Sequence, residues 1–177
     1  MVSLISTTFH FAESPPFKSP SADLGPKKEE SHLLPGTIAR PGDVTIRRWS
    51  NGRDAAIDVT VTSPLAASNV EGAVEPGASL NKAVQRKLRD TEEACRQEGL
   101  EFLPFAVETL GGFHAGAVVQ VKQIAAALAR SKGSEESEAI SQLFGKLSLT
   151  LQRCNAMMLA SRLQDSDFVL PEIDGIM

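Results

Sequence analysis

Two aspartates, Asp43 and Asp58, have the side-chain chemistry and the spacing of metal ligands. Asp43 begins one β-like run and Asp58 lies inside the next, with an Asn51-Gly52 step between the runs. In a hairpin, early residues of the first strand lie beside late residues of the second, so the two carboxylates would approach each other. Two adjacent anions need a cation, and Mg²⁺ prefers carboxylate oxygens and water. The alternative is that both are ordinary solvated or capping aspartates at strand ends.

A phosphodiester-cleaving site would need further charged groups. Metal-held water is the nucleophile in such hydrolysis, and a positive group must stabilise the developing phosphoryl charge. The segment NKAVQRKLRD offers four candidates, which are Lys82, Arg86, Lys87 and Arg89. The same cluster is also typical of the solvated face of a helix. Glu108, shortly before Gly111-Gly112, is either a third site carboxylate or a helix-capping acid.

Composition narrows the classes of function. A chain of 177 residues is long enough for one domain with a real core. The net charge of −4 gives no sign of nucleic-acid binding by the whole chain, so any such binding would need a local basic patch. Aromatic residues make up 5% of the chain and tyrosine is absent, which argues against stacking platforms for single-stranded nucleic acid.

The cysteines and histidines do not form a zinc motif. Cys95 and Cys154 have no CxxC partner, and the three histidines are scattered. We expect both cysteines to be small core residues in a reducing compartment. His114 is expected to stand at a helix start without a catalytic role. The segment LGGFHAG lacks the Lys-Ser/Thr of a phosphate loop, so we expect no small-molecule cofactor there.

Hydrophobic spacing and turn residues predict the elements that position these side chains. The Asn-Gly step predicts a tight hairpin, and Gly99 is a natural end for the first helix. The apolar run EFLPFAVET is typical of a strand buried on both faces. The predicted strands are Asp43–Trp49, Ala55–Thr62 and Glu101–Thr109, and the predicted helices are Ser79–Glu98, Ala115–Arg130 and Ser134–Leu163.

This order predicts an α/β protein of the α+β kind. The expected architecture is a small mixed β-sheet, made of a hairpin plus a βαβ crossover and covered by helices, with a C-terminal helical pair. Residues 1–39 form a Pro/Ser-rich leader that we expect to be mostly disordered, with one short turn of helix near Lys27–Leu34, and residues 40–112 form the α/β core. Residues 113–163 are helices that pack on this core, and residues 164–177 form an acidic tail.

Four segments together resemble one protein family. They are RPGDVTI…W…G…AAIDVTVTSPL, QRKLRD…C…G, FLPFAVETLGG and LFGKLSLTLQRCNAMMLASR. The combination is similar to the C-terminal region of reverse-transcriptase polyproteins from non-LTR retrotransposons. The resemblance spans about Leu33 to Leu163, and its most specific blocks are RPxDV, DVTVTSPL and PFAVETLGG.

The resemblance implies a restriction-endonuclease-like domain of the PD-(D/E)-x-K type, which nicks target DNA with Mg²⁺. Asp43 matches the first metal-binding aspartate of that family and Asp58 matches the second. The usual lysine two residues later is replaced by Thr60, and Lys87 matches the position from which retroelement versions take the lysine. Lys82, Arg86 and Arg89 would then contact DNA.

The function expected from this resemblance is a retroelement-derived, Mg²⁺-dependent DNA endonuclease, here as a detached fragment. The alternatives are a catalytically inactive remnant and a protein-interaction module that uses the C-terminal helices. We expect no membrane partner, and the sequence leaves the oligomeric state open. The start MVSLISTTFHF lacks a basic region and a continuous apolar region, so we expect no signal peptide and a nuclear or cytoplasmic protein.

Overall fold

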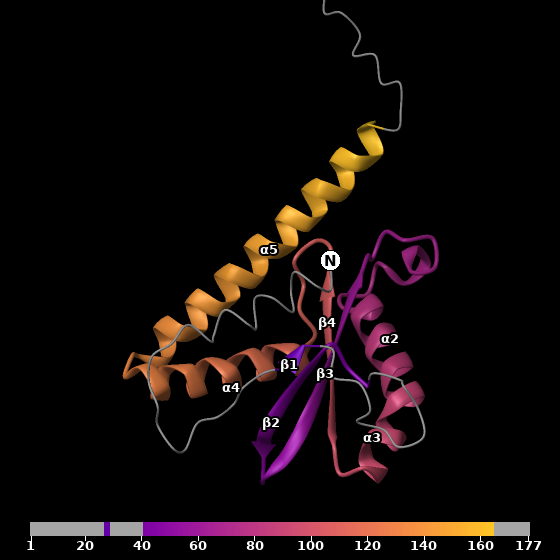
Figure 1. Ribbon diagram of the computed structural model, residues 1–177. Coiled ribbons are helices and arrows are strands. Elements are labelled where there is room, and N and C mark those ends of the chain that lie inside the picture. Colours follow the sequence, from indigo (N-terminus) through magenta and orange to yellow (C-terminus); the bar gives the residue numbers. More distant parts are fainter. Residues whose placement is uncertain (1–26, 29–40, 165–177) are drawn as a thin grey trace, which may run out of the picture.

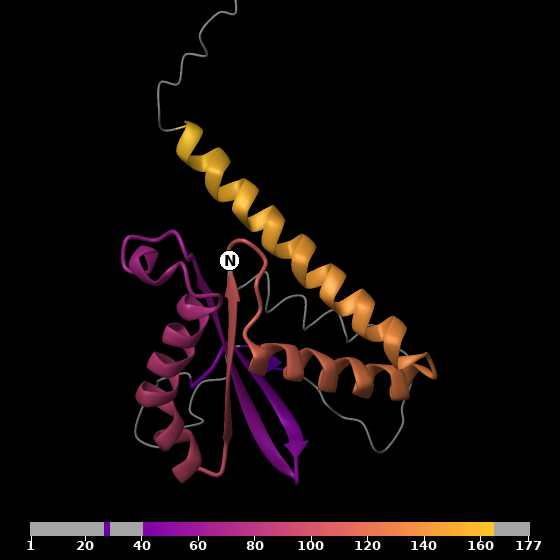
Figure 2. The same cartoon turned by 180° about the vertical axis from the view of Figure 1, so that it is seen from behind.

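The computed structural model of the chain describes residues 27–28 and 41–164 and has a mixed α and β architecture (Figure 1). A twisted sheet forms the middle layer. Helices α2 and α3 cover one side of it, and α4 and α5 cover the other, as both views show (Figures 1 and 2). The elements are β1 (Lys27–Lys28), β2 (Val44–Ser50), β3 (Arg53–Thr62), η2 (Val70–Gly72), α2 (Ala78–Lys87), η3 (Leu88–Glu92), α3 (Glu93–Gln97), β4 (Glu101–Glu108), α4 (Ala115–Lys132) and α5 (Glu136–Gln164).

The sheet has the order β1-β2-β3-β4 and contains the hairpin that the sequence predicts. Strands β2 and β3 pair antiparallel, with Val44 opposite Ile57. Asn51 and Gly52, the two residues of the turn, have φ values of 51° and 77°. Positive φ at both central residues is the mark of the hairpin turn whose twist matches that of the flanking strands, so the Asn-Gly prediction is confirmed.

Strands β3 and β4 form the predicted parallel pair, with eight residues of each strand in register from Ala55↔Glu101 to Thr62↔Glu108. The connection between them is a loop that contains η2, followed by one continuous helical run of α2, η3 and α3. The sequence predicts a single helix here. The structure adds a π-helical turn at Leu88–Glu92, which inserts one residue into the helical repeat.

Strand β4 lies at one edge of the sheet, and its outer side is covered. The chain after β4 turns back, so that the N–H of Glu108 donates to the carbonyl of Gly112 at 2.7 Å and the N–H of His114 donates to that of Ala106 at 3.0 Å. The side-chain amide of Gln120 on α4 donates to the carbonyl of Pro104 at 3.2 Å. Proline in a strand is tolerated at an edge because no ladder bond there needs its missing N–H, and the covered carbonyls discourage pairing with other chains.

The main core lies between the sheet and helices α4 and α5. Alternate residues of the strands point into it, which is why Ile57 and Phe105 are fully buried. The opposite face of the same strands packs against α2 and α3 through smaller clusters that contain Ala56 and Ala106. Strand β4 therefore contributes side chains to both layers, as its continuous apolar run predicts.

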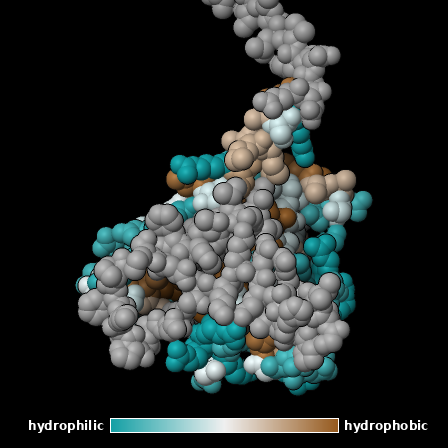
Figure 3. Space-filling model, in the orientation of Figure 1, coloured by the Kyte–Doolittle hydropathy of each residue, from teal (hydrophilic) through white to brown (hydrophobic). Residues whose placement is uncertain are grey.

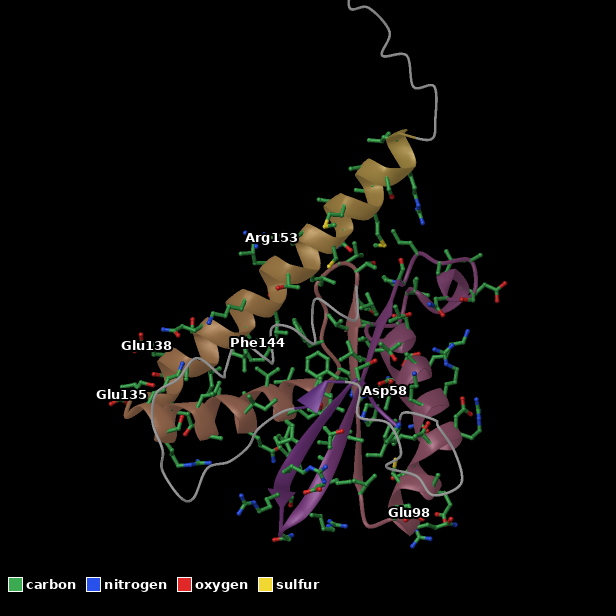
Figure 4. All side chains as sticks on the ribbon, viewed as in Figure 1. Asp58, Glu98, Glu135, Glu138, Phe144 and Arg153 are labelled. Atoms are coloured by element: carbon green, nitrogen blue, oxygen red, sulfur yellow. The ribbon has the colours of Figure 1, made fainter. Side chains whose placement is uncertain are left out.

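Helix α5 packs against the body over only part of its length. Its buried residues are Leu143, Leu147, Leu151 and Cys154, and Phe144 contacts Phe113 edge to face with ring centroids 5.5 Å apart. Figure 4 shows Phe144 on the side of α5 that faces the body, whereas Arg153 points away from it. The last turns of α5 continue past the sheet. Tan and brown colours gather where α5 leaves the body (Figure 3).

His114 is the N-terminal cap of α4, in agreement with the expected position at a helix start. Its Nδ1 accepts a hydrogen bond from the N–H of Gly116 at 3.1 Å, and its backbone is extended. We expect His114→Ala to lower the free energy of unfolding by about 1 kcal/mol, because an N–H of the first helical turn loses its acceptor. His114→Asp should keep most of the stability, since aspartate is a favourable cap. Urea denaturation measures both, and equal losses in the two variants would contradict a capping role.

Most of the predicted leader, residues 1–26 and 29–39, and nearly all of the acidic tail lie outside the described residues. Lys27 and Lys28 are described, and they form a short strand opposite Thr45 and Val44 of β2. The short turn of helix predicted near Lys27–Leu34 is therefore wrong at Lys27 and Lys28, which are extended. The outer edge of β2 offers unpaired backbone groups that can pair with extended backbone of any composition. Within the described part of the chain, no helix is long and apolar enough to cross a membrane.

Candidate functional site

Asp58 and Lys87 form an ion pair between the sheet and the crossover helix. The Nζ atom of Lys87 lies 2.7 Å from Oδ2 of Asp58, and the two side chains are 30% and 15% exposed. Asp58 is on the face of β3 that carries Ala56, toward α2 (Figure 4). Lys87 follows the buried Ala83 and Val84 by one helical turn, so it projects from the same side of α2. The sequence prediction that Lys87 faces Asp58 agrees with this geometry.

Asp43 lies beside Asp58 at the junction of β2 and β3. The pairing of Val44 with Ile57 sets Asp43 and Asp58 across from each other on the two strands. Two hydrogen bonds hold Asp43 against β3. Its main-chain N–H donates to the carbonyl of Ile57 at 2.8 Å, and its side-chain Oδ2 accepts a hydrogen bond from the N–H of Val59 at 2.7 Å. The hairpin therefore sets Asp43 and Asp58 opposite each other on adjacent strands.

Gly42 makes the close approach of Asp43 to β3 feasible. A Cβ atom at position 42 would lie 2.7 Å from the carbonyl oxygen of Ile57 and 2.9 Å from its carbonyl carbon. Both are main-chain atoms of the central strand, so they cannot move aside as a flexible side chain would. None of the residues predicted for the site was Gly42. Its position between Pro41 and Asp43 is the signal that could have revealed a backbone contact.

The π turn begins directly after Lys87. A regular helix advances about 100° per residue, so Lys87 and Cys95 would point about 80° apart. One inserted residue reduces this difference to about 20° and brings both side chains toward β3. Cys95 is fully buried beside Ala56, Leu100 and Phe102. The π turn thus lets the helix bury Cys95 and still direct Lys87 to Asp58.

Cys95 has a perturbed thiol next to the candidate site. Burial, and then the negative charge of Asp58, raise the pKa of Cys95 from 9.0 to about 11. A thiol whose folded pKa is raised contributes stability that is complete below about pH 9 and is lost as the pH rises through about 11. We therefore expect the free energy of unfolding of the reduced protein to fall over this range.

The fall should be smaller in Cys95→Ala, because that variant has no thiol to ionise at this position. Urea denaturation in reducing buffer from pH 8 to pH 11 measures it. Cys154→Ala is the control, since Cys154 is also a buried free cysteine but lies on α5. An unchanged fall in Cys95→Ala would show that other groups cause the alkaline loss.

Glu108 does not lie with the two aspartates. Asp58 pairs with Pro104 and Thr62 pairs with Glu108, so Glu108 lies four residues, about 13 Å, farther along the strands. Its Oε1 accepts a hydrogen bond of 2.6 Å from the hydroxyl of Ser79, in the first turn of α2. A carboxylate at a helix N-terminus is stabilised by the helix dipole. The geometry therefore favours the capping alternative for Glu108, at α2.

The three other basic residues of the helix project away from the ion pair. Lys82 donates to the carbonyl of Ser68 at 2.6 Å, so it contacts the loop before α2. Arg86 is exposed, and Arg89 is 74% exposed with its Nε 3.5 Å from Asp90. These positions are four and three residues apart, so they form one exposed stripe along the helix. The stripe flanks Lys87 without contributing to its ion pair.

The two aspartates have the right donor atoms for Mg²⁺. Among the described residues, no group of three or more His, Cys, Asp or Glu side chains could hold a metal ion, so the candidate ligand set is a carboxylate pair. An ionised carboxylate has two oxygens with about four acceptor positions, so it can hold a cation while it also accepts a hydrogen bond. Mg²⁺ commonly uses one or two protein carboxylates and completes its shell with water and substrate phosphate. Asp43 and Asp58 fit this pattern.

Comparisons of the chain with protein-family models, with curated proteins and with solved structures find no match.

Proposed function

We propose that this chain is a Mg²⁺-dependent, DNA-nicking endonuclease domain with a restriction-endonuclease-like fold. The proposal rests on the 2.7 Å ion pair between Lys87 and Asp58, with Asp43 on the adjacent strand. Sequence resemblance to the C-terminal region of non-LTR retrotransposon polyproteins led to the same three residues. A carboxylate pair beside one lysine is a set of groups suited to phosphodiester hydrolysis.

In the proposed reaction, Asp43 and Asp58 would hold Mg²⁺, which lowers the pKa of a bound water and polarises a phosphoryl oxygen. The water oxygen forms a new bond to phosphorus while one ester P–O bond breaks. The attacking water loses a proton to solvent, and the leaving oxygen gains one. Lys87 compensates the charge of Asp58 and supplies a positive group for the charge that develops on the phosphoryl oxygens. Val59 holds Asp43 in position through its N–H.

Nicking of supercoiled plasmid DNA tests this proposal. The wild-type protein should convert plasmid to the open-circular form in Mg²⁺ and not in EDTA. Asp58→Ala should remove this activity, because it deletes one metal ligand. Asp90→Ala is a control, since Asp90 is an exposed aspartate of η3 that takes no part in the proposed site. Equal nicking by the wild type and Asp58→Ala would refute the proposal.

A second candidate function, a protein-interaction module, is favoured by the end of α5. Met157, Leu159 and Leu163 are 63%, 62% and 58% exposed, although they are large and apolar. Exposed apolar clusters of this kind mark interaction surfaces. Size-exclusion chromatography with light scattering tests the simplest form, in which two copies associate. A monomer at high protein concentration would exclude that form.

A further inference from the structure

The hairpin between β2 and β3 contains a distortion that the proposed catalytic groups do not explain. Ile46 pairs with Ala55 and Ser50 pairs with Arg53, so three residues of β2, Arg47 to Trp49, lie opposite Asp54 alone. Arg48 has a φ of 52°, in the left-handed region that residues other than glycine seldom occupy. Such bulges re-aim side chains and are common near functional sites.

The bulge changes which side chain faces the core. Val44 and Ile46 point into the main core, and strict alternation would send Arg48 there next. The extra residues place Trp49 against this core instead, and Arg48 is exposed. The distortion thus packs the partly buried ring of Trp49 against the core and keeps the guanidinium of Arg48 outside.

Asp54, on the opposite strand, stabilises the bulge through hydrogen bonds. Its Oδ1 accepts the backbone N–H of Arg48 at 2.9 Å, and its Oδ2 accepts a hydrogen bond from the guanidinium of Arg47. The hydrogen bond from the backbone of Arg48 lowers the pKa of the Asp54 carboxyl, and the bond from Arg47 adds to the effect. Asp54, which the sequence predicts as a turn residue, is therefore an organising residue of the hairpin.

The result is a local basic surface on an acidic chain. Residues 47–54 carry three arginines against one aspartate, and with Glu101 of β4, which lies beside Arg53, this surface has one net positive charge on a chain whose net charge is −4. The guanidinium of Arg53 is 55% exposed and lies 3.8 Å from a carboxylate oxygen of Glu101. The lower end of the molecule, where this hairpin turns, is hydrophilic (Figure 3). Such a patch is complementary to a polyanion.

The distance from the candidate site indicates which polyanion fits. Arg53 lies five residues, about 16 Å, along β3 from Asp58. Phosphates along one DNA strand are spaced about 3.4 Å apart along the helix axis, so this distance corresponds to about five nucleotides. Because five is an odd number, the side chains of Arg53 and Asp58 leave opposite faces of β3, so a duplex with one phosphate at the site would reach Arg53 around the end of the hairpin.

We propose that the bulged β2–β3 hairpin is a DNA-backbone contact, in which Arg48 and Arg53 bind phosphates at a distance from the scissile bond. This inference rests on the proposed function, because it takes DNA as the ligand. It adds a positioning surface on the sheet to the basic stripe on the helix. Phosphate contacts of this type set the register of a duplex without reading its sequence.

Binding of a short fluorescent DNA duplex in EDTA tests the inference, because no cleavage occurs there. Arg48→Gly is the main variant. Glycine suits a positive φ, so the variant should fold with an unchanged or higher melting temperature. Loss of one phosphate contact should weaken binding about 8-fold at ~0.1 M salt, and should reduce the slope of log K against log salt by about 0.9.

Two further variants make the test specific. Arg48→Lys keeps the charge and should bind nearly as tightly as the wild type. Lys122→Ala on α4 removes one positive charge from an exposed site on another face, and should leave affinity almost unchanged. If Arg48→Gly fails to fold, Arg53→Gln serves in its place and should show the same loss.

Wild-type affinity in Arg48→Gly, or an equal loss in Lys122→Ala, would overturn the hairpin contact. Equal competition by polyglutamate and by unlabelled duplex would overturn it as well, because a phosphate site should prefer the duplex. The outcome is separable from that of the proposed function. A wild-type protein that binds the duplex through Arg48 and does not nick plasmid keeps the hairpin contact and refutes the endonuclease.

Discussion

Lys87→Met is expected to reduce Mg²⁺-dependent plasmid nicking by about 10²- to 10³-fold, the size of effect seen when one preorganised charge-stabilising group is removed. The ammonium of Lys87 is the positive group that lies against Asp58 in this structure. Methionine keeps the length and the apolar stem of the side chain, so the packing of α2 should change little. The initial rate of nicking measures the effect.

Arg86→Met is the matched control, because Arg86 is the preceding residue of α2 and is exposed. It removes the same charge from the helix and should lower the rate far less. If Arg86→Met and Lys87→Met lose the same activity, Lys87 contributes only to the general charge of the helix. That result would contradict the assigned role.

The Lys87–Asp58 ion pair should also contribute to the free energy of unfolding, and this contribution does not depend on nicking activity. Lys87→Met leaves Asp58, which is 15% exposed, without its cationic partner, and we expect a loss of about 1 to 2 kcal/mol. Asp58→Asn in the Lys87→Met background should restore part of that loss, because it removes the unpaired charge. Additive losses in the double variant would show that the two side chains are not coupled.

Phe105→Ala is expected to give the largest loss of stability, about 3–5 kcal/mol. Phe105 is fully buried in the main core and contacts Phe113 edge to face, with ring centroids 6.2 Å apart. Its removal leaves a cavity between β4 and the α4–α5 layer. A loss of this size is a large fraction of the stability of a typical domain, so the melting temperature should fall steeply.

Leu110→Ala is the control for this prediction. Leu110 is close to Phe105 in the sequence but 67% exposed, so its truncation should change the free energy of unfolding by less than about 0.5 kcal/mol. Urea denaturation followed by circular dichroism measures both variants. A similar small effect in both would mean that Phe105 is not in a well-packed core.

Local signals in the sequence were strong enough to predict most of the elements. Asn51-Gly52 predicted the hairpin because this pair tolerates the two positive φ values that the turn requires. The apolar run from Glu101 predicted a strand buried on both faces, which the structure has at Glu101–Glu108. The ends of the elements differ by at most two residues, because helix and strand termini carry the weakest signals.

The sequence was sufficient to place some residues of the candidate site and not others, and the reason is physical. Asp43 and Asp58 could be brought together by the hairpin alone, since pairing across a short turn is local. The place of Lys87 depends on how far α2 lies from β3, and its prediction came from the resemblance to a retroelement family. The sequence left Glu108 open between a third ligand and a helix-capping acid, and only the parallel register, which sets it at Thr62 and near Ser79, favours the second.

The sequence by itself determined the elements, their order, the hairpin and the alternation that separates core from solvent, because each depends on residues close together in the chain. Only the tertiary structure decided the contacts that depend on register and insertion. These are the fit of Gly42 against Ile57, the π turn that lets Cys95 and Lys87 both face β3, and the bulge that exposes Arg48. A one-residue shift in a strand or a helix redirects every later side chain, and no local pattern records where such a shift occurs.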